Sequence, residues 1–538
     1  MRRLVFIWIG FMVMLGGCTQ EKLCIAENGI ICYDEELQQY QVEKDAKVRV
    51  MVETEAYGQA LVELWNQEHP EQMNVIEPVV VQDFDAATWL GYKTDIALLW
   101  SNDAAQIINH FMSVQPELKD EIQEHVPLQF GELLNLDGLR YVPMSYYGMV
   151  FSTNVTMLGE LGYDVTDDNE DGLVDNFDSF EKLMALADDW NGRERDYHNR
   201  KITAVFPFSL SELWASLGFF SADDFRFFAS HEALAPGVDS DSFLETLKFM
   251  RAMGEHPWYL NANEEDESDE AQSADLNETE EDPAETDPEI EKTEEELPSD
   301  ADEQQEAQDN SETEEEILPY RVENDRVFEE GWLYDSYLEK LISPFSLVGT
   351  WMYYNQQEDI EQQDFYFSPM PSWESITLAP LAKTKGYLLA EGTKYPSASN
   401  EVLRLIRSEM GIQAYISTVN TIPAVTNVDK LENRPISSEE EMEDKVDSDR
   451  IKPYYLEFKN ENQRQISYAF SFSQEESMVA FEKDPSVRGW DMLAEIQLIE
   501  IAEDVIKQRI APEDALLKLI ENSESWMLPY QPVEEKTE

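Results

Sequence analysis

The hydrophobic pattern of the first hundred residues alternates between strand and helix. Residues 47–53 (KVRVMVE) alternate apolar and polar side chains as a strand does, and apolar residues then recur at helical spacing over 57–65. Residues 75–81, interrupted by Pro78, and 95–100 predict two more strands. This β-α-β order predicts a parallel sheet covered by helices, an α/β fold. Further helices are predicted at residues 180–187, 243–253, 400–408 and 491–508, and from Pro512 onward.

The start of the chain has the pattern of a secretion signal. Two arginines precede an apolar stretch over residues 4–15, followed by Leu-Gly-Gly-Cys. This stretch is shorter than the roughly 20 residues of a membrane-spanning helix. Leu-Gly-Gly-Cys resembles the bacterial lipobox, in which the cysteine receives a lipid. We therefore predict a signal peptide at residues 1–17, with Cys18 anchored to the outer face of the cytoplasmic membrane. An ordinary signal peptide with a chance cysteine is the alternative.

Two polar segments break the pattern. Residues 18–45 predict a tether between the anchor and a folded body, and they contain Cys24 and Cys32, which we expect to form a disulfide in an oxidising compartment, with two free thiols as the alternative. In residues 264–316, 27 of 53 residues are Asp or Glu and none is aromatic, which predicts a disordered insertion, with calcium buffering or partner binding as alternatives. A smaller acidic patch at 439–449 predicts a surface loop.

Composition narrows the function. The 538 residues carry a formal net charge of −73, so phosphate would repel the chain and a sequence-independent grip on nucleic acid is excluded. The six histidines form no HExxH, and no GxSxG, GxxxxGK[ST] or GxGxxG occurs, so zinc hydrolases, esterases and nucleotide-binding enzymes have no support. Carboxylate pairs for glycoside hydrolysis stay open, because 112 acidic residues make chance pairs common.

Residues 167–178 (DDNEDGLVDNFD) have the spacing of a calcium-binding loop. Calcium takes six to eight oxygen ligands, and this loop offers side-chain oxygens at its positions 1, 3, 5, 9 and 12, a carbonyl at position 7 and a turn glycine, Gly172, at position 6. Position 12 holds Asp rather than the usual Glu. The alternative is an acidic turn that caps the following helix. The predicted ligands of this structural calcium are Asp167, Asn169, Asp171, Leu173, Asp175 and Asp178.

An ordered series of segments carries a family resemblance. VRVMVETEAYGQALVELWNQEHP, DIALLWSND and GLRYVPMSYYGMVFSTNVTMLGELGYD are similar to the amino-terminal half of family 1 extracellular solute-binding proteins, a group that includes the maltose/maltodextrin-binding proteins. LVGTWMYYN, KGYLLAEGTKYPSASNEVLRLI, TVNTIPAV and RGWDMLAEIQ follow in the order of that family. The resemblance covers about residues 46–530 apart from the acidic insertion.

The resemblance implies a two-lobed periplasmic-binding-protein-like fold with a hinge and a ligand cleft between the lobes. It places the N-terminal lobe at residues 46–150 and 386–428 and the C-terminal lobe at 151–385 and 429–530. The chain would cross between lobes near residues 147–154, 385–388 and 424–431. A ligand that contacts both lobes would favour the closed form, which a membrane transporter can recognise.

The resemblance also implies a set of sugar-binding residues, in which aromatic faces pack on sugar rings and carboxylates accept hydrogen bonds from hydroxyls. Tyr147 stands where the family carries a Glu, and Glu55 where it carries a basic residue, so the sugar contacts would differ in detail. A strand-end Trp or Tyr that simply packs in the core is the alternative at each position. The matching positions are Glu55, Tyr57, Trp100, Asp103, Tyr147, Glu212, Trp214, Trp351 and Trp490.

The function that follows is capture, not catalysis. We expect a monomeric lipoprotein that binds a carbohydrate, such as a maltodextrin or another oligosaccharide, and delivers it to the permease of an ABC importer. The alternatives are the same scaffold binding a non-sugar solute, since aromatic cages also hold cations, and a surface glycoside hydrolase or adhesive lipoprotein.

Overall fold

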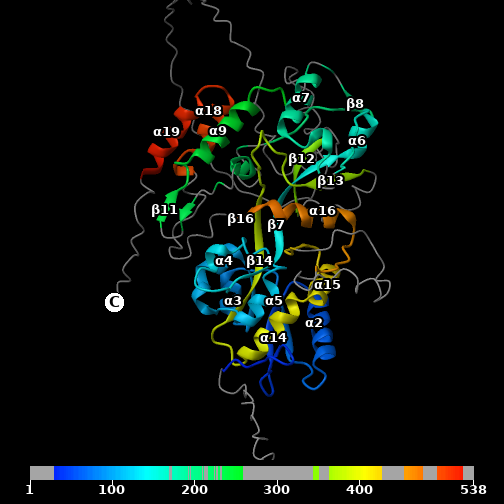
Figure 1. Ribbon diagram of the computed structural model, residues 1–538, viewed down its shortest axis with the longest axis vertical. Coiled ribbons are helices and arrows are strands. Elements are labelled where there is room, and N and C mark those ends of the chain that lie inside the picture. The colour runs from blue at the N-terminus through cyan, green and yellow to red at the C-terminus, as the bar shows by residue number, and fades with distance from the viewer. Residues whose placement is uncertain are drawn as a thin grey trace, which may run out of the picture.

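The protein consists of two lobes joined by long strands. The computed structural model describes residues 30–168, 172–191, 193, 195–208, 210, 216–222, 225, 228–230, 233–258, 343–350, 363–426, 453–475 and 494–524. Figure 1 shows the lobes stacked along the long axis, with β7 (Val142–Asn154) and β14 (Leu381–Ala390) running from one into the other. We call the lobe around the first strands of the chain the N lobe and the other the C lobe.

The sheet confirms the predicted β-α-β unit. β3 (Val48–Val52) pairs in parallel with both β4 (Ile76–Val80) and β5 (Ile96–Trp100), and the helix α2 (Glu55–Glu68) connects β3 to β4. β4 ends the strand order, so Pro78, which has no N–H to donate, lies in an edge strand. α2 packs closely on β4, because a Cβ added at Gly58 would lie 2.6 Å from the Cβ of Pro78. The strand order of this sheet is β12 (Phe345–Gly349), β7, β14, β5 (Ile96–Trp100), β3 (Val48–Val52) and β4 (Ile76–Val80). Four short strands pair with its two long strands: β13 (Phe365–Ser368) and β15 (Ile422–Pro423) with β7, and β6 (Phe111–Met112) and β16 (Gln474–Glu475) with β14.

Two separate hydrophobic cores lie along β7 and β14. In β7 the buried side chains belong to the N-lobe core up to Met144 and to the C-lobe core from Tyr146 onward. In β14 the order is reversed: the buried side chains belong to the C-lobe core up to Ala382 and to the N-lobe core from Tyr387 onward. The chain therefore passes between the lobes at these points, and the lobe boundaries implied by the family resemblance stay predictions.

The N lobe covers its sheet with six described helices. α2 begins at an N-cap, Thr54, whose hydroxyl accepts a hydrogen bond from the Tyr57 N–H at 3.1 Å. Its residues Tyr57, Leu61 and Trp65 are buried, which confirms the helical spacing in the sequence. Among the described helices of the whole chain, none is both long and apolar enough to cross a membrane. The others in this lobe are α3 (Ala86–Tyr92), α4 (Ser101–Ile107), α5 (Pro116–Ile122), α14 (Pro396–Arg407) and α15 (Glu409–Thr418).

The segment predicted as a tether is folded from residue 30 onward. β1 (Tyr33–Asp34) and β2 (Gln39–Tyr40) form a hairpin beside α14. The Glu43 carboxylate accepts the N–H groups of Ser397 and Ala398, both at 2.8 Å, and so caps the first turn of α14. The expected start of the folded body at residue 46 is thus corrected to residue 30. The hairpin has few apolar positions and its partners lie far along the chain, so local pattern does not predict it. Cys32 is disulfide-bonded, and Cys24, its predicted partner, lies outside the described residues, as does Cys18.

The C lobe packs helices around an aromatic core. The helices predicted at residues 180–187 and 243–253 are confirmed, and the one predicted at 491–508 contains α18, which begins at Leu498. Figure 1 places α16 (Glu461–Ala469) where the two lobes meet, beside β7 and β14. The described helices of this lobe are α6 (Val155–Glu160), α7 (Phe180–Trp190), α9 (Asp241–Met253), α16 (Glu461–Ala469), α18 (Leu498–Ile506) and α19 (Pro512–Ser523).

Candidate functional site

Aromatic and charged side chains meet where the central strands end. Glu53 follows β3 and Trp100 ends β5, so the two lie at the carboxyl edge of parallel strands, where α/β sheets commonly bind ligands. The strand register places Lys385 of β14 opposite Trp100, and Lys383 opposite Tyr147 of β7. Both lysines lie between the last C-lobe and the first N-lobe core residues of β14. The cluster therefore sits where the chain passes between the lobes.

The contacts within this cluster centre on Trp100. Tyr147 meets it edge-on at 5.3 Å between ring centroids, and the Lys383 ammonium lies 4.8 Å from the Trp100 centroid. Lys385 lies 5.1 Å from Trp100 and 4.4 Å from the ring of Phe84, whose carbonyl accepts the Trp100 N–H at 3.0 Å. Phe84, Trp100, Tyr147 and Lys383 are each half-buried, so part of every side chain faces solvent. We call these four residues together with Glu53 and Lys385 the Trp100 cluster.

A nearly buried ion pair forms the inner part of the Trp100 cluster. Lys385 Nζ lies 2.7 Å from Glu53 Oε1, and the two side chains are only 10% and 12% exposed. The Tyr415 hydroxyl also donates to Glu53. Burial removes most of the water around both charges, so each depends on the other for stabilisation. The ion pair and the hydrogen bond from Tyr415 together hold the Glu53 carboxylate in one position. Glu53 is thus fixed from three elements: β3, β14 and α15.

A group of buried tyrosines lies beneath this ion pair. Tyr57 packs edge-on against Tyr415 at 5.0 Å, and both rings, like that of Tyr387, are fully buried in the N-lobe core. Burial raises the pKa of all three phenols above the usual value of 10, so each stays protonated and able to donate a hydrogen bond. Tyr57 was predicted to contact the ligand, but the structure buries it completely in this layer, where it packs against Tyr415.

The remaining candidate ligand residues lie partly near the Trp100 cluster and partly outside the described residues. The Asp103 carboxylate lies in the first turn of α4 and accepts hydrogen bonds from the Ala86 N–H at 3.4 Å and from Asn102 Nδ2 at 3.1 Å. Burial raises the pKa of Asp103, and the Lys383 charge partly offsets that rise. Glu55 is exposed on the first turn of α2. Of the nine candidates the structure brings Trp100 and Tyr147 into contact. Outside the described residues lie Glu212, Trp214, Trp351 and Trp490.

The described part of the predicted calcium loop is organised by its own carboxylates. Asp167 Oδ2 accepts the Gly172 N–H at 2.9 Å, and Asp175 Oδ2 accepts the Asp168 N–H at 3.1 Å. Gly172 has φ +85°, the left-handed conformation that the tight turn requires. The Asp178 carboxylate lies 2.8 Å from Lys182 Nζ, so a cation would compete with that lysine. Leu173 is buried, and Asn169 and Asp171 lie outside the described residues.

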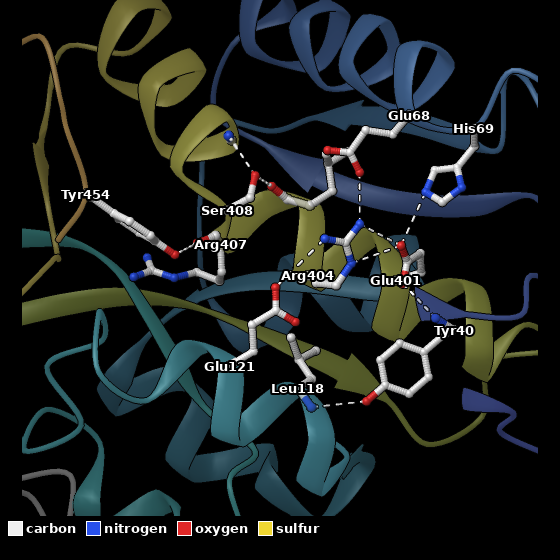
Figure 2. A network of polar contacts seen from close by, with 12 residues as sticks. Tyr40, Glu68, His69, Leu118, Glu121, Glu401, Arg404, Arg407, Ser408 and Tyr454 are labelled. Carbon is white, nitrogen blue, oxygen red and sulfur yellow. Dashed lines mark hydrogen bonds and ion pairs between the residues drawn. The ribbon is translucent and has the colours of Figure 1, made fainter. Parts of the chain in front are cut away.

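A second acidic cluster is already occupied by an arginine. Ligand atoms of Glu68, His69 and Glu401 lie within 4.8 Å of one another, a spacing that would suit a metal ion. Figure 2 shows the Arg404 guanidinium between these carboxylates, 2.7 Å from Glu401 and 2.8 Å from Glu68, with Glu121 at 3.8 Å. The arginine supplies the positive charge that a metal would bring, so this network is structural.

Several members of the Trp100 cluster were not predicted from the sequence. Lys383 and Lys385 are two residues apart on one strand, so they point to the same face, but nothing local links them to Trp100. Glu53 lies within the matched segment two residues before Glu55, but no partner for its charge is visible in the sequence. The only signal in the sequence is the i, i+2 spacing of the two lysines beside the apolar stretch GYLLA.

Comparison with known proteins defines the class of fold. No family model and no curated protein matches the chain. Among solved structures the chain is similar to proteins with the two-lobed α/β fold of solute-binding proteins. One is the extracellular solute-binding protein from Staphylococcus aureus in complex with maltose, at a TM-score of 0.52 and 12% identity over 90% of this chain and 98% of that one. At this identity the likeness establishes the fold alone, and it confirms the α/β, two-lobed architecture predicted from the sequence.

Proposed function

We propose that this protein is the solute-binding lipoprotein of an ABC importer and captures a carbohydrate by closure of its two lobes. The observation that carries the proposal is the half-exposed pair Trp100 and Tyr147, located where β7 and β14 pass between the lobes. Aromatic faces of this kind pack on the apolar faces of sugar rings. An oligosaccharide such as a maltodextrin would span the N lobe and the C-lobe candidates Glu212, Trp214, Trp351 and Trp490.

The remaining parts of the proposal concern location and mechanism. Lipidation of Cys18 would hold the monomer at the outer face of the cytoplasmic membrane, within reach of its permease. Binding without turnover is sufficient for this role, since a ligand that touches both lobes stabilises the closed form. The similar staphylococcal protein is itself described as solute-binding and holds maltose.

A cationic solute fits the Trp100 cluster poorly. An aromatic cage for a quaternary amine needs a free aromatic face without nearby positive charge. Here the ammonium groups of Lys383 and Lys385 both lie about 5 Å from the Trp100 centroid. These two ammonium groups already occupy positions beside the Trp100 ring that a cationic solute would need, which favours a neutral solute.

Trp100→Ala is expected to weaken binding of the captured sugar at least about tenfold, because it removes the stacking surface. The measurement is isothermal calorimetry on the mature chain, with the sugar first identified by a thermal-shift screen of mono- and oligosaccharides, amino acids and quaternary amines. Tyr92→Ala is the matched control, since Tyr92 is an exposed aromatic of the same lobe. Equal affinity of parent and Trp100→Ala would remove Trp100 from the site, and a screen without any sugar response would contradict the proposed function.

We also propose that residues 167–178 hold a structural calcium ion. Calcium bound only to the folded state raises the melting temperature, by about 2–4 °C for each 1 kcal/mol of linkage. Calcium should therefore stabilise the parent protein against a chelator, and Asp175→Ala should abolish that difference. Asp189→Ala is the control, because Asp189 pairs with Arg193 and Arg195 outside the loop. A parent melting curve that is the same with calcium and with chelator would refute the site.

A further inference from the structure

A chain of contacts leads from the buried layer of the N lobe to the Trp100 ring. The Tyr415 hydroxyl donates to the Glu53 carboxylate, and Lys385 Nζ lies 2.7 Å from Glu53 Oε1. The Lys385 ammonium also lies 4.4 Å from the centroid of the Phe84 ring and 5.1 Å from that of the Trp100 ring. In the strand register Lys385 stands directly opposite Trp100, so the two are cross-strand neighbours. One charged side chain thus joins an ion pair to two aromatic rings.

The members of this chain differ in how much surface they offer to a solute. Tyr415 is fully buried, and the side chains of Lys385 and Glu53 are only 10% and 12% exposed. Trp100 is half-buried at the end of β5. A bound solute would therefore pack on the indole, and the ion pair would act on the solute through that ring.

Stability alone does not account for an ion pair at this place. Taking two charges out of water is costly, and neutral side chains of similar size often replace a buried ion pair with little loss of stability. A buried pair does provide a fixed geometry, because neither charge can turn away without losing its partner. Here that geometry holds an ammonium group within cation–π distance of Trp100.

A fixed indole favours the packing of a sugar ring. A tryptophan side chain at a strand end has several staggered rotamers, and ordering it on binding would weaken the affinity. The ammonium of Lys385, together with the Tyr147 ring edge-on at 5.3 Å, restricts the Trp100 ring before a solute arrives. Binding then carries little further cost for ordering that ring.

We infer that the Glu53–Lys385 ion pair is a positioning device for Trp100, which holds the indole in the orientation on which a sugar ring packs. The inference rests on the proposed function and adds two positioning residues to it. It implies that the affinity for the solute depends on charges that the solute itself does not contact.

The first test neutralises the pair as a unit. Glu53→Gln/Lys385→Met removes both charges together, since either substitution alone would leave a buried charge unpaired and destabilise the lobe. We expect affinity for the captured sugar to fall about five- to tenfold in calorimetry on the mature chain, with maltotriose as the first probe and then the saccharides of the thermal-shift screen. Glu503→Gln/Lys507→Met is the matched control, because that ion pair, at 3.0 Å, lies in the C lobe. The control should change the affinity by less than about twofold.

A double-mutant cycle separates positioning from a general structural role. In a Trp100→Ala background the neutral pair should change sugar affinity by less than about twofold, because the ring that the pair positions is absent. A general weakening of the N lobe would instead cost the same factor in both backgrounds. The indole N–H signal of Trp100, in protein labelled with ¹⁵N-tryptophan and assigned by Trp100→Phe, should shift or broaden in the neutral variant and stay unchanged in the control.

The outcomes separate this inference from the proposed function. Equal sugar affinity in the parent and in Glu53→Gln/Lys385→Met would overturn the inference and leave the proposed function standing. The same loss with and without the Trp100 ring would also overturn it, since the pair would then act by another route. A parent that binds no saccharide would contradict the proposed function, and an unchanged Trp100 indole signal in the neutral variant would then overturn the inference on its own evidence.

Discussion

Arg407→Ala is expected to lower the free energy of unfolding by about 3–5 kcal/mol, the largest effect of any single substitution considered for this protein. The Arg407 side chain is fully buried at the end of α14. Its guanidinium donates to the carbonyl oxygens of Pro143 at 3.0 Å, His125 at 3.1 Å and Ala424 at 3.1 Å. Alanine would leave a cavity and remove all three donors at once.

The position of Arg407 explains why these bonds matter for the lobes. Pro143 belongs to β7, and Ala424 directly follows β15. At Ala424 and Val425 the buried side chains change from the C-lobe core to the N-lobe core, so Arg407 joins two segments that run between the lobes. Burial lowers the pKa of Arg407, but three carbonyl acceptors provide the polar surroundings that its charge needs. The guanidinium therefore fixes the N-lobe end of the connection.

The measurement for Arg407→Ala is equilibrium urea unfolding followed by tryptophan fluorescence and circular dichroism. Arg49→Ala is the matched control, because the half-buried Arg49 also donates to a carbonyl, that of Tyr92 at 2.7 Å, but this hydrogen bond is exposed to solvent. We expect the control to lose less than about 1 kcal/mol. Similar losses of unfolding free energy in the two variants would show that the three buried hydrogen bonds of Arg407 do not contribute more than one exposed bond.

The sequence was most informative where local pattern and burial coincide. The strand at residues 47–53 and the helix beginning near residue 57 were predicted because their apolar residues follow one period, and the structure buries them. The α14 helix was predicted at 400–408, but it begins at Pro396, where Glu43 from the hairpin caps it. Local pattern contains no information about such a distant cap.

The candidate site, like the fold, was predictable only where the signal is local. Trp100 was identifiable as a strand-end aromatic within a family resemblance, and the structure places it against Tyr147 as part of one cluster. Glu53, Lys385 and Tyr415 were not identifiable, because each reads locally as an ordinary surface or core residue and they meet only when β3, β14 and α15 come together. Partners separated by hundreds of residues are set by topology, which periodicity does not encode.

Glu401→Gln should lower the free energy of unfolding by about 3 kcal/mol at neutral pH, because it removes one partner of a buried ion pair. The Glu401 carboxylate is fully buried and accepts the Tyr40 N–H at 2.9 Å and two hydrogen bonds from Arg404 (Figure 2). Glutamine would direct an amide N–H₂ toward these donors. Glu461→Gln is the matched control, because Glu461 pairs with Arg464 at the same i, i+3 spacing on an exposed helix face. We expect it to cost less than about 0.5 kcal/mol.

The effect of Glu401 should also depend on pH with a defined sign. Burial by itself would raise the pKa of Glu401, but the contact with His69 at 3.3 Å and the hydrogen bonds from Arg404 outweigh it and lower the pKa below its ordinary value of 4.5. A carboxyl with a lower pKa in the folded state stabilises the protein above the unfolded-state pKa, and that contribution is lost as the pH falls through the folded-state value. The difference in stability between parent and Glu401→Gln should therefore be constant from about pH 6 to 7.5 and shrink below about pH 4.5. Urea unfolding of both proteins across this range measures it, and a difference that stays constant or grows in acid would show that the network does not hold Glu401 ionised.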